Sequence, residues 1–129
     1  MKRTVIDPGW TKGRNLTFSP GARIGKFLFV SGMVGKTDEK GKILSKGDMK
    51  SQAREVYEKI RVILEAAGAT FDNVIKTTDY VTTFEGYKET AEVRREVFGR
   101  DFPAATGVLV QGLTNREALI EIEAIAVID

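Results

Sequence analysis

Apolar residues recur every three or four positions between residues 49 and 67, which predicts an amphipathic helix. Asp48 stands where it can cap the first turn, and Gly68 stands where it can end the helix in a left-handed conformation. The predicted buried face is made by Met49, Ala53, Val56, Tyr57, Ile60, Ile63, Leu64 and Ala67.

Runs of β-branched and aromatic residues predict strands before this helix. Residues 21–32 form the main run, in which Gly25-Lys26 is a tight-turn signal between two strands. A short additional strand is predicted at residues 3–6, ended by Asp7-Pro8-Gly9.

A strand is predicted directly after the helix, at residues 74–83, followed by a second helix at about residues 86–98. Alternation along the strand puts Ile75, Thr77, Asp79 and Val81 on one face, and Val74, Thr78 and Tyr80 on the other. The predicted apolar stripe of the second helix is Tyr87, Ala91, the aliphatic stem of Arg94, Val97 and Phe98.

Two further strands, at about residues 105–111 and 119–127, finish the chain. One face of the last strand carries Glu121 and Glu123 with Leu119, Ile125 and Val127, and the other carries Ile120, Ile122, Ala124 and Ala126. Both faces are largely apolar, which favours burial on both sides of the sheet.

The predicted order is β-β-α-β-α-β-β with an extra N-terminal strand, an α/β arrangement of the α+β sandwich type. We expect a single domain, residues 1–129, with both helices on one face of a mixed sheet. Two helices cover only one face, so the sequence predicts an oligomer in which another subunit covers the second face.

Composition narrows the possible partners. The net charge is +2, and the basic residues alternate with acidic ones, which does not favour nucleic-acid binding. No apolar run approaches the roughly 20 residues of a membrane span. Residues 1–8 lack the apolar stretch of a signal peptide, and the chain has no cysteine, so a cytoplasmic protein is expected.

The chain also contains no histidine. Without histidine and cysteine there is no Ser-His-Asp triad and no imidazole or thiolate metal site, so neither a metal nor another cofactor is expected. A general base near neutral pH would have to be a carboxylate or lysine with a shifted pKa.

Several short motifs occur in a distinctive order: Phe18-Ser19-Pro20-Gly21-Ala22, Phe29-Val30-Ser31-Gly32, Leu64 to Ala69, Phe102 to Gly107, and Ile120 to Ala126. Together they resemble the RidA family, the reactive intermediate (enamine/imine) deaminases, from about Phe18 to the C-terminus. The resemblance implies a chorismate-mutase-like fold and a homotrimer with small-molecule clefts between subunits.

The sequence departs from the family at the position of its substrate-binding arginine, which is Ala105 here. Alanine cannot replace the bidentate fork that an arginine offers to a carboxylate. Phe18 replaces the family's tyrosine, Ala91 its asparagine, and Gly107 stands two residues after the missing arginine. Ordinary 2-imino-acid deaminase activity is therefore expected to be weak or absent.

Glu121 is retained, and the resemblance implies that it holds the attacking water as the catalytic residue. An alternative is that Glu121 only pairs with a lysine or arginine across a subunit interface. Glu123 is the less favoured catalytic candidate. The two share a face, so desolvation of both would raise the pKa of one of them.

Arg94 and Arg23 are two candidates to replace the missing arginine, and for each the alternative is a solvated surface cation. Arg94 is preferred because it lies within the apolar stripe of its helix. The predicted substrate-binding residues are Phe18, Ser31, Gly32, Arg94, Ala105, Thr106 and Gly107.

The sequence leaves two functions open. One is a hydrolase or deaminase acting on a small reactive enamine or imine metabolite, with water held by Glu121. The other is a non-catalytic trimer that binds a small ligand in the same cleft. A ribonuclease is disfavoured, because the chain has no histidine and no basic stripe with exposed aromatics.

Overall fold

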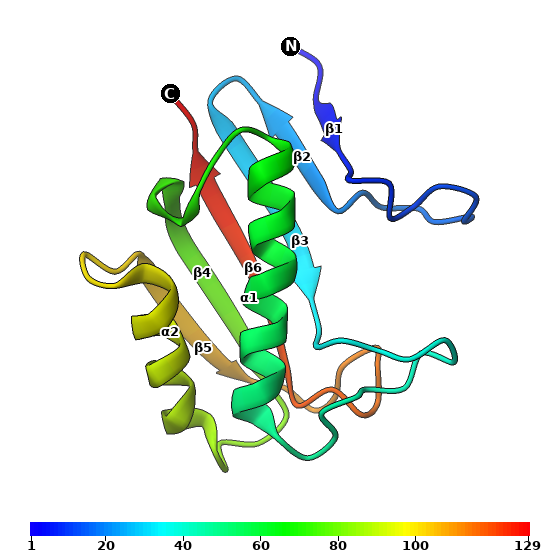
Figure 1. Cartoon of the computed structure of the whole chain (residues 1–129), viewed down its shortest axis with the longest axis vertical. Helices are drawn as coiled ribbons and strands as arrows, with labels where there is room; N and C mark the ends of the chain where they lie inside the picture. Colours follow the sequence, from blue (N-terminus) through cyan, green and yellow to red (C-terminus); the bar gives the residue numbers. More distant parts are fainter.

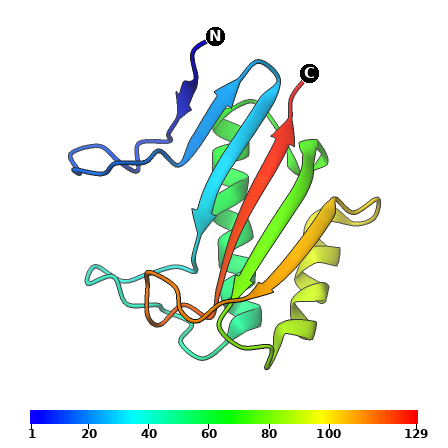
Figure 2. The ribbon, with the colours of Figure 1, turned by 180° about the vertical axis from the view of Figure 1, so that it is seen from behind.

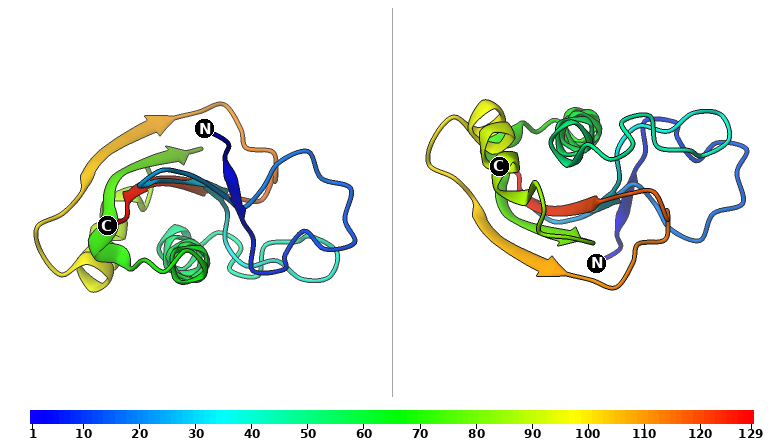
Figure 3. Two further views of the ribbon diagram at one scale, coloured as in Figure 1. Left: turned by 90° about the horizontal axis from the view of Figure 1, so that it is seen from above. Right: turned by 90° about the horizontal axis from the view of Figure 1, so that it is seen from below.

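Two helices lie on one face of a six-stranded sheet in the computed structural model, which describes residues 1–129 (Figures 1 and 3). The elements are β1 Thr4–Ile6, β2 Gly21–Ile24, β3 Phe27–Met33, α1 Met49–Ala66, β4 Val74–Val81, α2 Thr90–Phe98, β5 Ala104–Leu109 and β6 Ile120–Val127, with 3₁₀ turns at Phe71–Asn73 and Tyr87–Glu89. The predicted α+β fold is confirmed, including the extra N-terminal strand.

The strand order is β1-β2-β3-β6-β4-β5, in which β4 and β5 are parallel and the other neighbours are antiparallel. The last strand of the chain therefore lies between β3 and β4, in the middle of the sheet. Its residues alternate between buried and half-buried, so every second side chain of β6 points away from the helices.

Helix α1 begins and ends where the sequence predicts. The side chain of Asp48 accepts a hydrogen bond from the Ser51 N–H at 3.0 Å, and Gly68 has a φ of 76° just past the helix. The predicted apolar face is buried against the sheet, with Ala53, Ile63 and Leu64 fully inaccessible. Replacing either of the two larger side chains with alanine would cost about 2–5 kcal/mol of stability.

The faces predicted for β4 are wrong at its first two residues. Val74 is buried and Ile75 is 47% exposed, because the pairing of β4 with β6 shifts between Val74 and Lys76. Such an irregularity reverses the side-chain alternation locally. From Thr77 onward the prediction is confirmed, and Thr77, Asp79 and Val81 are buried.

The second helix begins later than the sequence predicts. A 3₁₀ turn at Tyr87–Glu89 precedes α2, so the regular helix begins only at Thr90. Tyr87, Val97 and Phe98 of the predicted stripe pack against the core, and Val93, which the predicted stripe omits, is fully buried.

The helices leave one face of the sheet uncovered (Figure 2), and this face carries exposed aromatic side chains at one end. Phe27 and Phe29 are each about half exposed and pair with Val127 and Ile125 of β6. We call this side of the sheet the open face. No helix has the length and apolar character needed to cross a membrane.

Candidate active site

Glu121 lies on the open face near the start of β6. Gly32 of the neighbouring strand β3 is directly beside it, and a Cβ atom on Gly32 would overlap the Glu121 carboxylate. Only glycine at this position lets the carboxylate lie against the β3 backbone. Gly32 and Glu121, both predicted as site residues, are thus brought together by two adjacent strands.

The two carboxylates of β6 have different environments. Glu121 has no hydrogen bond or ion pair within the chain, and burial together with the nearby Glu123 raises the pKa of its carboxyl above the usual range. Glu123 accepts a hydrogen bond from the Tyr80 hydroxyl at 2.7 Å. Glu121 is therefore the carboxylate left free to bind a water or a ligand.

Phe18 and Ser31 belong to the same side of the site. Ser31 donates from its hydroxyl to the Ser19 carbonyl at 2.6 Å and from its backbone to the Pro20 carbonyl at 2.9 Å, which holds this segment against β3. Phe18 is 62% exposed. Together with Phe29 it borders an open hollow of about 460 Å³ next to Ser31.

Ala105 and Gly107 lie on the opposite side of the sheet, on the edge strand β5. Their parallel pairing partners on β4 are Thr77 and Asp79, both buried under the helices. The intervening Thr106 points to the open face, where its hydroxyl accepts a hydrogen bond from the Lys76 ammonium at 2.6 Å. The predicted substrate-binding residues therefore fall into two groups on opposite faces.

Arg94 of α2 reaches the β5 edge on the helix side. Its guanidinium donates through Nη1 to the Tyr57 hydroxyl at 2.7 Å and to Thr77 Oγ1 at 2.9 Å, and it lies 5.1 Å from the centre of the Phe98 ring. Since Thr77 pairs with Ala105, Arg94 carries its charge to the neighbourhood of the missing arginine.

Arg23 does not share that position. It lies on β2, which three strands separate from β5, and its Nε donates to the Gly25 carbonyl at 3.0 Å. Of the two arginines that the sequence offers as replacements, only Arg94 lies beside Ala105 within one chain.

Two further polar residues at the β5 edge are absent from the predicted site. Asp79 is only 4% exposed, and its Oδ2 accepts a hydrogen bond from the Tyr87 hydroxyl at 2.7 Å, while Oδ1 has no partner. Burial raises the pKa of both side chains. An aspartate that shares a predicted strand face with Ile75 and Val81 is the sequence signal that points to this pair.

Gly107 is the residue that makes room for Tyr87. A Cβ atom on Gly107 would overlap the Tyr87 hydroxyl, so the ring oxygen lies directly against the β5 backbone. The absence of a side chain at Gly107 thus allows the Tyr87 hydroxyl to occupy this position.

Replacing Asp79 with asparagine is expected to stabilise the protein at pH 7 by on the order of 1 kcal/mol, because a buried charge lacking one partner is removed. The contribution of protonated Asp79 is fully present below its ordinary pKa of 3.8 and is lost as pH rises through the raised folded-state pKa. Denaturant unfolding at pH 4 and pH 7 should therefore show a larger gain at pH 7. An equal loss of stability at both pH values would contradict this account.

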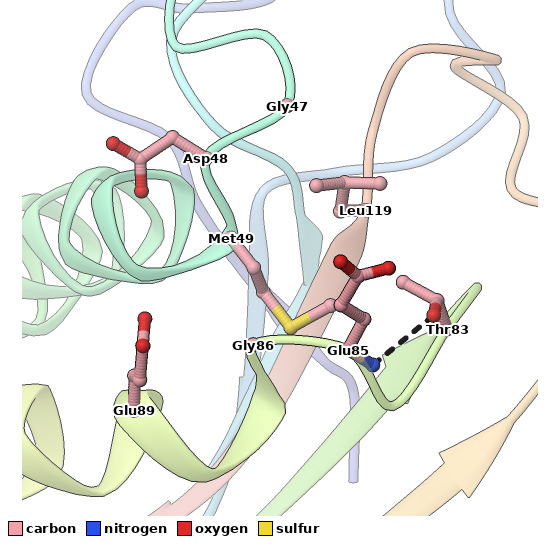
Figure 4. A pocket seen from close by; sticks show the side chains of 8 residues that line it. All are labelled: Gly47, Asp48, Met49, Thr83, Glu85, Gly86, Glu89 and Leu119. Atoms are coloured by element: carbon pink, nitrogen blue, oxygen red, sulfur yellow. Dashed lines mark hydrogen bonds between the residues drawn. The ribbon is translucent and has the colours of Figure 1, made fainter.

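Another hollow, of about 630 Å³, lies at a different part of the molecule (Figure 4). It is lined by Gly47, Asp48, Met49, Thr83, Glu85, Gly86, Glu89 and Leu119, none of which belongs to the predicted site. Asp48 is already engaged as the cap of α1. No group of three or more His, Cys, Asp or Glu side chains is arranged to hold a metal ion.

Comparison with known proteins identifies the family of this chain. The model of the family described as Endoribonuclease L-PSP matches residues 14–128. RutC family protein PH0854 of Pyrococcus horikoshii is 42% identical over 109 residues, which are 84% of this chain and 85% of the relative. The chain belongs to the RidA (YjgF/L-PSP) family.

Solved structures of RidA-family proteins have the same fold. A putative endoribonuclease from Thermotoga maritima is 31% identical with a TM-score of 0.86, covering 100% of this chain and 99% of its own. A Mycobacterium tuberculosis member of the YjgF/YER057c/UK114 family is also 31% identical, with a TM-score of 0.82 and coverage of 98% and 100%.

Proposed function

We propose that this RidA-family protein hydrolyses a small enamine or imine, with Glu121 as the residue that holds and deprotonates the attacking water. The supporting observation is the Glu121 carboxylate itself, which is partly desolvated, has no partner and lies against Gly32. Water adds to the carbon of the C=N bond while Glu121 takes one water proton and passes it to the nitrogen, which gives a carbinolamine. Transfer of the hydroxyl proton of the carbinolamine to the nitrogen, again through Glu121, then breaks the C–N bond and releases ammonia and a carbonyl compound.

The active cleft lies between subunits of a homotrimer in this proposal. Glu121 is on the open face and Arg94 is on the helix side of the same sheet, so one chain cannot bring the two together. A second copy covering the open face can place its β5 edge next to Glu121 of the first. The half-exposed Phe27 and Phe29 give that face the apolar character of a subunit interface.

Arg94 is the anion-binding residue of the proposed cleft. Only its Nη1 is engaged, by two hydroxyl groups, so the remaining N–H groups are free to bind a carboxylate. The positive charge of Arg94 reaches the cleft from α2, and not from β5, where Ala105 occupies the position of the family's arginine. The carboxylate of a substrate must accordingly lie elsewhere than that of an ordinary 2-imino acid.

Residues 1–129 act as one RidA-like domain in this proposal, and the protein works in the cytoplasm without a cofactor. The second candidate function is a trimer that binds a small ligand and does not hydrolyse it. Ala105 favours this alternative, because the family's carboxylate fork is absent. Measuring whether the protein hydrolyses an imine distinguishes the two functions.

Ammonia release from two kinds of imine tests the proposal. Imines made from serine or threonine are expected to react weakly, whereas the imine that an amine oxidase makes from 4-aminobutanoate, with a distant carboxylate, is expected to react faster. Fast turnover of the serine and threonine imines would refute the interpretation of Ala105. Saturable binding with no turnover of any imine would leave the binding trimer.

A further inference from the structure

The Tyr87–Asp79 pair lies beside Gly107, two residues along β4 from the place where Arg94 binds Thr77. Residues two apart on one face of a strand are separated by roughly 7 Å. The helix side of the β5 edge therefore has a cationic position next to Ala105 and a different polar position next to Gly107.

The second position is suited to accept hydrogen bonds. A phenol has a single hydrogen, and Tyr87 gives it to Asp79 Oδ2, so the ring oxygen is left with lone pairs only. The carboxyl behind it is 96% buried and has one oxygen without a partner, which makes this end of the site unfavourable for an anion. An N–H group of a ligand can donate a hydrogen bond to the Tyr87 oxygen and brings no negative charge to the buried carboxyl, so it fits this position.

We propose that the Tyr87–Asp79 pair binds a nitrogen-bearing group of the ligand, an ammonium or protonated imine, while Arg94 binds an anionic group of the same molecule. The ligand class is a small zwitterion whose nitrogen and anion are several ångströms apart. The assignment of that nitrogen as the one released by hydrolysis rests on the proposed function, whereas the binding arrangement does not.

Titration of the ¹⁵N-labelled protein with 4-aminobutanoate, butanoate and butylamine, followed by NMR, tests the arrangement. Wild type is expected to bind 4-aminobutanoate at least about tenfold more tightly than either monofunctional compound, with shifts at the Gly107 amide. Tyr87→Phe should lower the affinity for 4-aminobutanoate to that for butanoate and leave butanoate unchanged. Arg94→Gln should weaken the binding of both 4-aminobutanoate and butanoate.

Tyr80→Phe is the matched control, because Tyr80 also donates to a carboxylate at 2.7 Å but does so on the open face. It should change none of the three affinities. Equal binding of 4-aminobutanoate and butanoate by wild type, no saturable binding of 4-aminobutanoate, or an equal loss for both compounds in Tyr87→Phe would overturn the proposal.

Glu121→Gln separates this inference from the proposed function. The variant should keep the tenfold preference for 4-aminobutanoate even though it has lost turnover. A wild-type protein that shows the Tyr87-dependent preference and hydrolyses no imine would disprove the hydrolase and leave the binding arrangement intact. A wild-type protein that hydrolyses an imine but shows no Tyr87-dependent preference for 4-aminobutanoate would disprove the binding arrangement and leave the hydrolase intact.

Discussion

Glu121→Gln is expected to lower the rate of imine hydrolysis by about 10²-fold to 10⁴-fold, because the side chain keeps its shape but can no longer take a proton from water. Ammonia release with a saturating substrate measures the loss. The variant should fold and unfold like wild type or be slightly more stable at pH 7, since a partly desolvated carboxylate is removed.

Glu123→Gln is the control for this prediction. It removes the other charge of the same face, but its amide oxygen can still accept the Tyr80 hydroxyl, so activity should stay within a few-fold of wild type. An equal loss of activity in both variants would mean that the pair of charges matters and not Glu121 alone.

The pH dependence is set by the same carboxylate. Glu121 must be ionised to act as a base, and burial and Glu123 raise its pKa above the ordinary 4.5. Activity of the wild-type protein should therefore fall as pH is lowered through that raised pKa, at a higher pH than for an exposed glutamate. Glu123→Gln should shift this acid limb to lower pH.

Phe29→Lys is expected to convert the proposed trimer to monomers and to abolish activity. Phe29 lies in the apolar part of the open face, and a lysine there would be buried without a partner in a subunit interface. Sedimentation velocity measures the oligomeric state, and ammonia release measures activity. The monomer itself should remain folded, because the side chain lies outside the core between sheet and helices.

Leu44→Lys is the matched control for the interface variant. Leu44 is a similarly exposed apolar residue, 61% accessible, but it lies in the loop before α1 and not on the sheet. Its replacement should change neither assembly nor activity. A Phe29→Lys protein that keeps the wild-type sedimentation coefficient and activity would show that the open face is not the interface.

The fold was largely predictable because its strongest signals are local. The caps of α1 are side-chain and glycine effects within one turn, and the alternation along β6 is an uninterrupted period of two. The errors occur where a neighbouring element changes a local period. The shift in pairing with β6 exposes Ile75, and the 3₁₀ turn at Tyr87 delays the start of α2 to Thr90.

The site was less predictable because its geometry depends on residues distant in the chain. No local sequence signal shows that Gly32 makes room for Glu121, or that Gly107 makes room for Tyr87. Each of these contacts joins two segments that are far apart in the sequence. The motifs also place Ala105, Thr106 and Gly107 in one group. Alternation along the predicted strand already puts Thr106 on the other face, but the pairing with β4 is needed to show that Ala105 and Gly107 lie beside Thr77 and Asp79.

A shared cleft is the central claim, and mixed oligomers of two inactive variants test it most directly. Glu121→Gln and Arg94→Gln each damage a different half of the shared cleft. When the two variants are refolded together in equal amounts, about a quarter of the clefts should combine the two intact halves. The mixture should therefore show about a quarter of wild-type ammonia release. Each variant alone should stay inactive. Mixed oligomers with no more activity than the separate variants would contradict a cleft built from two subunits.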